Sequence, residues 1–168
     1  MIRHAKPEDL PAIRSILDGA RIFMHRSGNH HQWIDGYPSD QIILKDIAED
    51  NFYVEETEGR INGCFAFILG EEPTYARIQG AWLDNLPYGT IHRLASDGSQ
   101  KGFTDRCVEF CVSKISNLRA DTHRDNLIMQ KALLRNGFRF CGIIRVANGS
   151  ERLAYQRTAP SLRDLGNL

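Results

Sequence analysis

The chain has 168 residues, 42% of them hydrophobic, which is enough to bury one continuous core in a single domain. Lysine and arginine together number 21, and so do aspartate and glutamate, so no net charge is available to attract nucleic acid or anionic lipid headgroups. We therefore expect a small-molecule partner, with no nucleic acid and no membrane.

The sequence begins without an apolar leader, and no apolar run approaches the length of a membrane span, so a cytoplasmic protein is expected. Apolar stretches surround all four cysteines, which is typical of reduced core residues: Cys64, Cys107, Cys111 and Cys141. No cysteine and histidine pattern has the spacing of zinc ligands, so no metal is expected.

In chain order, residues 2–4 form a short strand candidate, and Asp9 is expected to cap a helix that has Pro11 in its first turn. Glycines, a proline and two adjacent histidines make residues 21–39 poor helix material, which predicts a loop carrying aromatic side chains. A second helix is expected to start at Ser39.

Residues 52–54 and 61–69 favour β-structure and flank residues 58–60, whose composition is typical of a hairpin turn. A further strand is expected at 90–95, and a glycine-containing loop then leads into a helix at 104–115. The middle of the chain therefore predicts an antiparallel pair followed by a strand, a loop and a helix.

In the last part of the chain, a strand is expected at 118–122 and a helix at 126–136. Gly137 is expected to end this helix by adopting the left-handed conformation. Residues 138–146 and 152–157 indicate a closing hairpin. The resulting order, β-α-α-β-β-β-α-β-α-β-β, predicts an α/β fold with a mixed sheet and helices on both faces.

The loop that joins the strand at 90–95 to the next helix is the first segment that indicates a binding site. A loop that leads into the N-terminus of a helix leaves backbone N–H groups unpaired at the positive end of the helix dipole, where a pyrophosphate can bind. Lys101 adds a cation, although Gly98 and Gly102 are equally typical of ordinary turns. The glycine spacing matches neither a P-loop nor a dinucleotide-binding fingerprint.

Three segments, residues 91–104, 121–126 and 134–138, together resemble the GNAT superfamily of acyl-CoA-dependent N-acyltransferases, bacterial type, in order and spacing. The resemblance extends from Ile2 to about Arg157. It implies one GNAT domain at 1–157, with a central, mixed and mostly antiparallel sheet, followed by a polar tail at 158–168.

The resemblance also implies how acetyl-CoA binds. The strand that pairs with the pantetheine arm would include Leu94, Ala95 and Ser96. The pyrophosphate loop would include Gln100, Lys101, Gly102, Phe103 and Thr104. Asn126 would bond the pantetheine, or alternatively cap its own helix. Ser99 and Thr104 depart from the family's loop pattern, and Leu133 stands where the family commonly has a tyrosine that protonates the departing thiolate.

The mechanism that the resemblance implies is direct attack of a neutral amine on the thioester. His92 is the candidate base, unless it packs under the sheet, and Tyr155 is the candidate replacement for the missing acid. Trp33 and Tyr37 lie in the region that shapes the acceptor pocket, and Trp82 lines the same cleft or belongs to the core.

We therefore expect an N-acetyltransferase that transfers an acetyl group from acetyl-CoA to a primary amine of a small molecule or peptide. The alternative is a catalytically weakened acyl-CoA-binding sensor or interaction domain, because the tyrosine is missing and the loop is altered. The sequence leaves the acceptor and the oligomeric state open, with a homodimer among the options.

Overall fold

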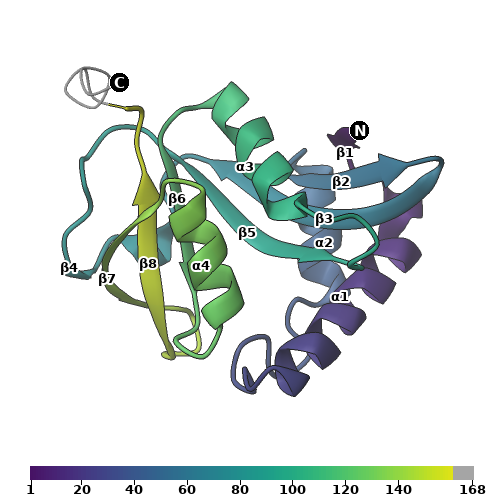
Figure 1. Cartoon of the computed structure of the whole chain (residues 1–168), viewed down its shortest axis with the longest axis horizontal. Coiled ribbons are helices and arrows are strands. Elements are labelled where there is room, and N and C mark those ends of the chain that lie inside the picture. Colours follow the sequence, from purple (N-terminus) through teal and green to yellow (C-terminus); the bar gives the residue numbers. More distant parts are fainter. Residues whose placement is uncertain (161–168) are drawn as a thin grey trace.

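The computed structural model describes residues 1–160, and Figure 1 shows its strands and helices. The strands are β1 (Ile2–His4), β2 (Phe52–Thr57), β3 (Arg60–Leu69), β4 (Gln79–Gly80), β5 (Gly89–Ser96), β6 (Leu118–Thr122), β7 (Arg139–Arg145) and β8 (Glu151–Arg157). The helices are α1 (Leu10–Arg26), α2 (Asp40–Ala48), α3 (Phe103–Lys114) and α4 (Leu127–Arg135), with short 3₁₀ helices η1 (Pro7–Asp9) and η2 (Pro73–Tyr75).

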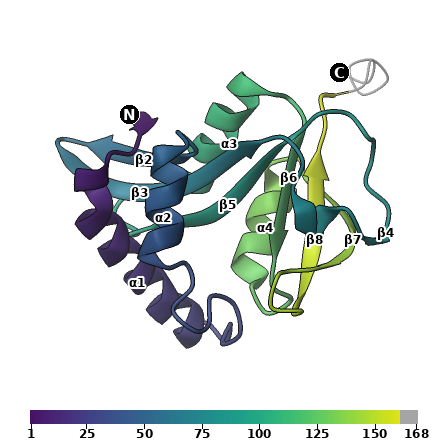
Figure 2. The same ribbon diagram turned by 180° about the vertical axis from the view of Figure 1, so that it is seen from behind.

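The eight strands form one sheet in the order β1-β2-β3-β5-β6-β8-β7-β4. The β5–β6 pair is parallel, and the other neighbouring strands are antiparallel. Helices α1 and α2 cover one face, while α3 and α4 cover the other, as the two opposite views show (Figures 1 and 2). The expected mixed, mostly antiparallel α/β fold is confirmed.

Each face of the sheet buries its own core, because successive side chains of a strand point to opposite faces. Along β2, Phe52 and Val54 pack in the core under α1 and α2, whereas Tyr53 between them packs in the core under α3 and α4. A third cluster, formed around Tyr75 and Tyr88, lies where η2 and the segment before β5 meet β7 and β8. The sheet is therefore anchored on both faces along most of its width.

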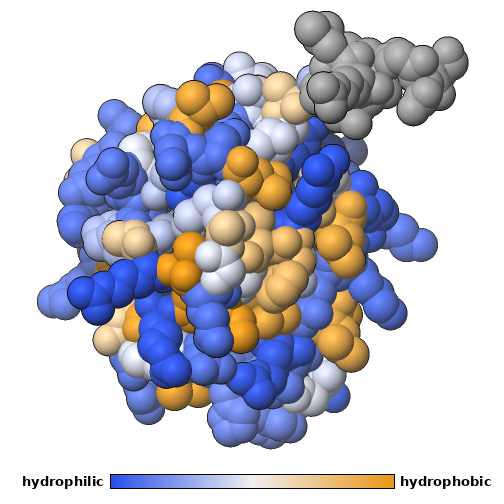
Figure 3. All heavy atoms as spheres, turned by 90° about the vertical axis from the view of Figure 1, so that its left-hand side faces the viewer, coloured by the Kyte–Doolittle hydropathy of each residue, from blue (hydrophilic) through white to orange (hydrophobic). Residues whose placement is uncertain are grey.

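The end of the sheet that carries β4 and β7 presents an apolar patch. Three large apolar side chains there are exposed, namely Leu83, Leu86 and Phe140. Seen from this side, apolar side chains gather near the middle of the face and polar ones surround them (Figure 3).

Most predicted elements and their caps are confirmed. Ser39 caps α2 by accepting a hydrogen bond from the Ile42 N–H at 3.3 Å, and Gly137 ends α4 with a φ of 82°. Glu58 and Gly59 form the turn between β2 and β3. The two-residue strand β4 and both 3₁₀ helices were not predicted, because such short elements leave no periodic pattern.

Three expectations are corrected. The predicted loop at 21–39 starts too early, because α1 continues to Arg26, where basic residues in the last turn complement the helix dipole. Asp9 does not cap α1 with its side chain, because its carboxylate accepts hydrogen bonds from Arg3 and from the Lys6 N–H. Cys141 is only partly buried, whereas the other three cysteines are buried and free as expected.

The expected polar tail at 158–168 lies outside the described residues from position 161 onward. Within the part of the chain that is described, no helix is long and apolar enough to span a bilayer.

Gly63 of β3 allows the first residue of α3 to pack on the sheet. A Cβ at this position would lie 2.5 Å from the ring of Phe103, which is buried. We expect Gly63→Ala to lower the free energy of unfolding by about 1–3 kcal/mol, the usual cost of overpacking a core. Urea denaturation monitored by circular dichroism measures this.

The matched control is Gly19→Ala in α1, where no atom lies within 4 Å of the added methyl group. Alanine is a better helix former than glycine, so this variant should gain about 0.5–1 kcal/mol. Equal denaturation midpoints for Gly63→Ala and the unmodified protein would contradict the packing argument.

Candidate active site

Strands β5 and β6 start side by side and then separate. They pair in parallel only from Gly89 opposite Leu118 to Ile91 opposite Ala120. Beyond this point β5 pairs with β3 and β6 pairs with β8. The facing edges of the two strands therefore have no partner strand within the described residues, and their backbone N–H and C=O groups need water or a ligand.

A β-bulge in β5 coincides with the separation. Between the pairs that His92 and Ala95 make with β3, two residues of β5 stand opposite one residue of β3. Arg93, the first of the two, has a φ of 55°, which residues other than glycine rarely adopt. Its guanidinium donates to Asp46 of α2 at 2.8 Å and lies over the ring of Tyr37. An extra residue bends a strand, so the bulge directs the end of β5 away from β6.

A cavity of about 710 Å³ occupies the space between the separated strands. Its wall includes residues of α1 and the loop that follows, of β5 and β6, and of α3 and α4. Because these helices cover opposite faces, the cavity crosses the sheet. Eight of the predicted site residues line it: Trp33, Tyr37, His92, Leu94, Ala95, Ser96, Thr104 and Asn126.

The wall under α3 and α4 is mainly apolar. Val108 of α3 and Met129 of α4 line it together with Leu94 of β5. Leu133, at the position where the resemblance leads us to look for a tyrosine, also lies in this wall and is 3% exposed. This half of the cavity can therefore hold a ligand segment that carries no charge and is partly apolar.

Asn126 lies in the wall at the start of α4. Its side-chain oxygen accepts from the Met129 N–H at 3.1 Å and so caps the helix, as the alternative interpretation expects. Its amide nitrogen donates to Gln32 at 3.0 Å. Gln32 belongs to the loop after α1, so these contacts connect the two helix layers across the cavity.

The loop from Ser96 to Thr104 closes one end of the cavity, since both of these residues line it. Gly102 has a φ of 76° and occupies the N-cap position of α3, a left-handed conformation that favours glycine. Among the described residues, none accepts a hydrogen bond from the N–H groups of residues 100–105. These groups lie at the positive end of the α3 dipole, an arrangement that binds anions.

The opposite half of the cavity, on the face of α1 and α2, contains ionisable side chains beside apolar ones of α1 and the loop after it, such as Phe23, Met24 and Ile34. His92 Nε2 lies 3.2 Å from Glu72 Oε2, and both side chains are mostly buried. The hydrogen bond with His92 lowers the pKa of Glu72 to about 2, against the opposing effect of burial. The Tyr75 hydroxyl donates to Asp121 Oδ2 at 2.6 Å. The cavity thus contains an imidazole held by a carboxylate, which is the arrangement of an oriented general base.

Two predicted site residues lie away from the cavity. Tyr155 belongs to the core under α3 and α4, where its ring packs edge-on against Phe140 and burial raises its pKa. Trp82 donates from its indole to the Tyr75 carbonyl at 3.0 Å and stacks on the guanidinium of Arg119. Trp82 therefore stabilises the backbone of Tyr75 from outside the cavity. Of the predicted site residues in this segment, Gln100, Lys101, Gly102 and Phe103 do not line the cavity, whereas Ser96 and Thr104 on either side of them do.

The structure brings to the cavity several charged residues for which the sequence predicts no role, namely Glu72, Arg93, Asp121 and Arg152. They come from a loop, a bulge and two separate strands, and no local spacing connects them. Only a signal that reports contacts between distant residues could have identified them together.

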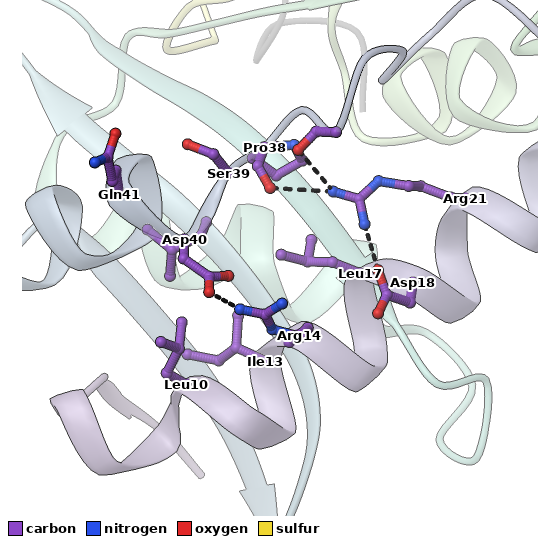
Figure 4. A pocket seen from close by; sticks show the side chains of 12 residues that line it. Leu10, Ile13, Arg14, Leu17, Asp18, Arg21, Pro38, Ser39, Asp40 and Gln41 are labelled. Carbon is purple, nitrogen blue, oxygen red and sulfur yellow. Dashed lines mark hydrogen bonds and ion pairs between the residues drawn. The ribbon is translucent and has the colours of Figure 1, made fainter.

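A second hollow, of about 460 Å³, lies between α1 and α2 (Figure 4). Its charged side chains are engaged with one another, Arg14 with Asp40 and Arg21 with Asp18 and the Pro38 carbonyl. None of the predicted site residues lines it. The larger cavity is therefore the candidate active site.

The His92–Glu72 pair should make stability depend on pH in acid. The folded-state pKa of Glu72 lies below its ordinary value of 4.5, so its ionised form stabilises the fold above that value. This contribution is lost as the pH falls from about 4.5 to about 2. Glu72→Gln should therefore show a shallower loss of unfolding free energy across this range, measured by urea denaturation at each pH.

His92→Gln provides the matched test, because it removes the partner that lowers the pKa of Glu72. His92→Gln should also show a reduced slope, although Glu72 keeps its hydrogen bonds with Thr74, and the double variant should match Glu72→Gln. A slope in His92→Gln that equals that of the unmodified protein would mean that the two side chains do not interact in solution.

Comparison with solved structures identifies proteins of the same fold. A crystal structure of a GNAT-family acetyltransferase from Streptococcus agalactiae is 31% identical, covers 96% of each chain and has a TM-score of 0.86. A GNAT-family acetyltransferase from Listeria monocytogenes is 20% identical over 95% of this chain and 94% of its own, with a TM-score of 0.70.

A third structure, N-acetylglutamate synthase from Neisseria gonorrhoeae complexed with coenzyme A and N-acetyl-glutamate, is 19% identical and has a TM-score of 0.63. It matches 96% of this chain and 35% of its own. At such identities the Listeria and Neisseria proteins show a shared fold alone. No family model matches the sequence, and no curated protein matches it.

The Streptococcus agalactiae protein is similar in sequence as well as in fold over nearly the whole of both chains. The chain belongs to the GNAT family of acetyltransferases.

Proposed function

We propose that this protein transfers the acetyl group of acetyl-CoA to the amine of a small molecule by direct attack. One observation carries the proposal: a single cavity crosses the sheet where β5 and β6 separate, with unpaired N–H groups near one end and the His92–Glu72 pair in the half that faces α1 and α2. This arrangement can hold a long acyl donor on one side and an acceptor on the other.

The residues around the cavity fit coenzyme A. The unpaired edge of β5 at Leu94, Ala95 and Ser96 can pair with the amide groups of a pantetheine arm, as a neighbouring strand would. The N–H groups from Lys101 to Thr104 can bind the pyrophosphate at the N-terminus of α3, and Lys101 adds a cation. The coenzyme A in the Neisseria gonorrhoeae structure supports this choice of donor.

Acetyl-CoA supplies the thioester, and the protein supplies position and a base. His92 accepts a proton from the attacking amine, while ionised Glu72 holds the imidazole and stabilises its charged form. Backbone N–H groups near Leu94 and Ala95 stabilise the negative charge on the carbonyl oxygen. The carbon–nitrogen bond forms, the carbon–sulfur bond breaks, and the sulfur leaves with the electron pair.

The departing sulfur needs no dedicated acid. Leu133 lies in the wall of the cavity and cannot donate a proton, and Tyr155 lies in the core outside the cavity. A thiol has an ordinary pKa of about 8.5, so it can leave as a thiolate near neutral pH. The missing tyrosine is therefore compatible with turnover.

Gly102→Val should weaken acetyl-CoA binding about 10-fold or more, because a branched side chain in the left-handed region displaces the N–H groups at the start of α3. Gly98→Val is the matched control: Gly98 also has a positive φ, of 77°, but precedes the anion-binding segment. Isothermal titration calorimetry measures both affinities. Equal losses of acetyl-CoA affinity in the two variants would show that the N-terminus of α3 has no specific role in binding.

His92→Gln should lower kcat about 10²–10⁴-fold, the usual contribution of a general base, and should leave acetyl-CoA affinity unchanged. Release of free thiol across a panel of amines measures the rates. If the unmodified protein binds acetyl-CoA but acetylates no amine, the sensor alternative replaces the enzyme.

A further inference from the structure

Arg152 of β8 is a buried cation in the half of the cavity that contains the ionisable side chains. It is 7% exposed and lines the cavity near the loop between β7 and β8. Its neighbour Leu153 packs against the core under α3 and α4, so the alternation of the strand directs Arg152 to the opposite face. Asp121, whose carboxylate binds Tyr75, faces the same side.

The guanidinium of Arg152 has no carboxylate partner within 4 Å among residues 1–160. Its Nη1 donates to the Ser150 hydroxyl at 2.8 Å and to the Glu151 carbonyl at 3.0 Å. The Glu151 carboxylate is engaged elsewhere, with Arg124 and Arg145. The hydrogen bonds of the described chain thus leave Nε and Nη2 of Arg152 available.

Other buried or partly buried arginines of the described chain have compensating contacts. Arg93 binds Asp46, and Arg106 binds Glu55. Arg119 is stacked between two aromatic rings, those of Trp82 and Tyr88, at 4.1 and 3.9 Å from their centroids. Arg152 differs from all three, because it faces the cavity with neither an ion pair nor a stacked ring.

A buried charge without a partner is unfavourable, which is visible in the pKa of Arg152. Burial lowers this pKa, and the charge of Asp121 only partly opposes the effect. An anion that enters the cavity would remove this penalty. A guanidinium binds a carboxylate through two parallel hydrogen bonds, which makes it selective for that shape.

The donor does not supply this anion. Its phosphates belong at the N-terminus of α3, and its pantetheine arm and thioester carry no charge. Arg152 lies on the other face of the sheet, with Asp121 and the ring of Tyr75. The anion must therefore belong to the acceptor.

We propose that the acceptor is an amine that also carries a carboxylate, as an amino acid does, and that Arg152 binds this carboxylate. The inference rests on the proposed acyl transfer and gives its acceptor a chemical class. The charges are complementary: Arg152 faces the carboxylate, while Asp121 and the His92–Glu72 pair attract the ammonium before it loses its proton.

The test is a binding experiment that does not need turnover. The protein saturated with coenzyme A is titrated with the twenty common amino acids, β-alanine and 4-aminobutyrate, each compared with its carboxamide and its decarboxylated amine. At least one acid should bind about 10-fold or more tightly than both of its counterparts that lack the carboxylate. If every acid binds no better than its own amide, the inference is wrong.

Three variants make the test specific to Arg152. Arg152→Gln should abolish the preference for the carboxylate, and Arg152→Lys should retain part of it, because lysine keeps the charge but lacks the paired donors. Arg145→Gln, on the same hairpin but exposed, is the control and should retain the full preference. Coenzyme A affinity reports whether each variant is folded. If Arg152→Gln does not fold, the carboxylate preference of Arg152→Lys alone tests the inference.

Three further results test this inference separately from the proposed function. Tighter binding of phosphoethanolamine than of β-alanine would show a phosphate site and overturn the carboxylate assignment. A carboxylate preference in binding without any release of thiol would support the anion site and contradict acyl transfer. Acetylation of amides and amines as efficient as that of acids would support acyl transfer and overturn the role of Arg152.

Discussion

The separation of β5 from β6 is the constraint on which the rest of the site depends. Two parallel strands that stayed paired along their length would leave no room between them and no free backbone edge. The bulge at Arg93 prevents this, and Asp46 and Tyr37 hold its side chain on the face of α1 and α2. A residue in an unfavourable backbone conformation persists only where its surroundings fix it, and here they do so at the cavity.

The opening between the strands divides the cavity into two chemically different halves. The half under α3 and α4 is apolar and ends at unpaired N–H groups, whereas the half under the loop after α1 contains ionisable side chains. This difference follows from the alternation of side chains along β5 and β6, because Ile91 and Ala120 face one helix layer and His92 and Asp121 the other. A donor and an acceptor can therefore approach the same opening from opposite faces of the sheet.

The packing behind the cavity keeps both halves in place. Because Gly63 has no side chain, the ring of Phe103 can pack on β3, and this contact fixes the start of α3 beside the cavity. On the other face, the indole of Trp82 supports the backbone of Tyr75, whose hydroxyl in turn holds Asp121. Gln32 joins the loop after α1 to Asn126 on α4. Residues without a direct chemical role thus determine the geometry of those that have one.

The sequence by itself determined most of the secondary elements, their order, the mixed sheet and the positively polarised start of α3, because capping, turn chemistry and periodicity are local properties. The resemblance to the GNAT superfamily also implied His92 as the base and the edge of β5 as the place where pantetheine binds. Only the tertiary structure decided that Glu72 holds His92, that Tyr155 lies in the core, and that Arg152 faces the cavity without a carboxylate partner among the described residues. Each of these depends on contacts between segments that are distant in the chain, and a local pattern carries no information about which distant side chains meet.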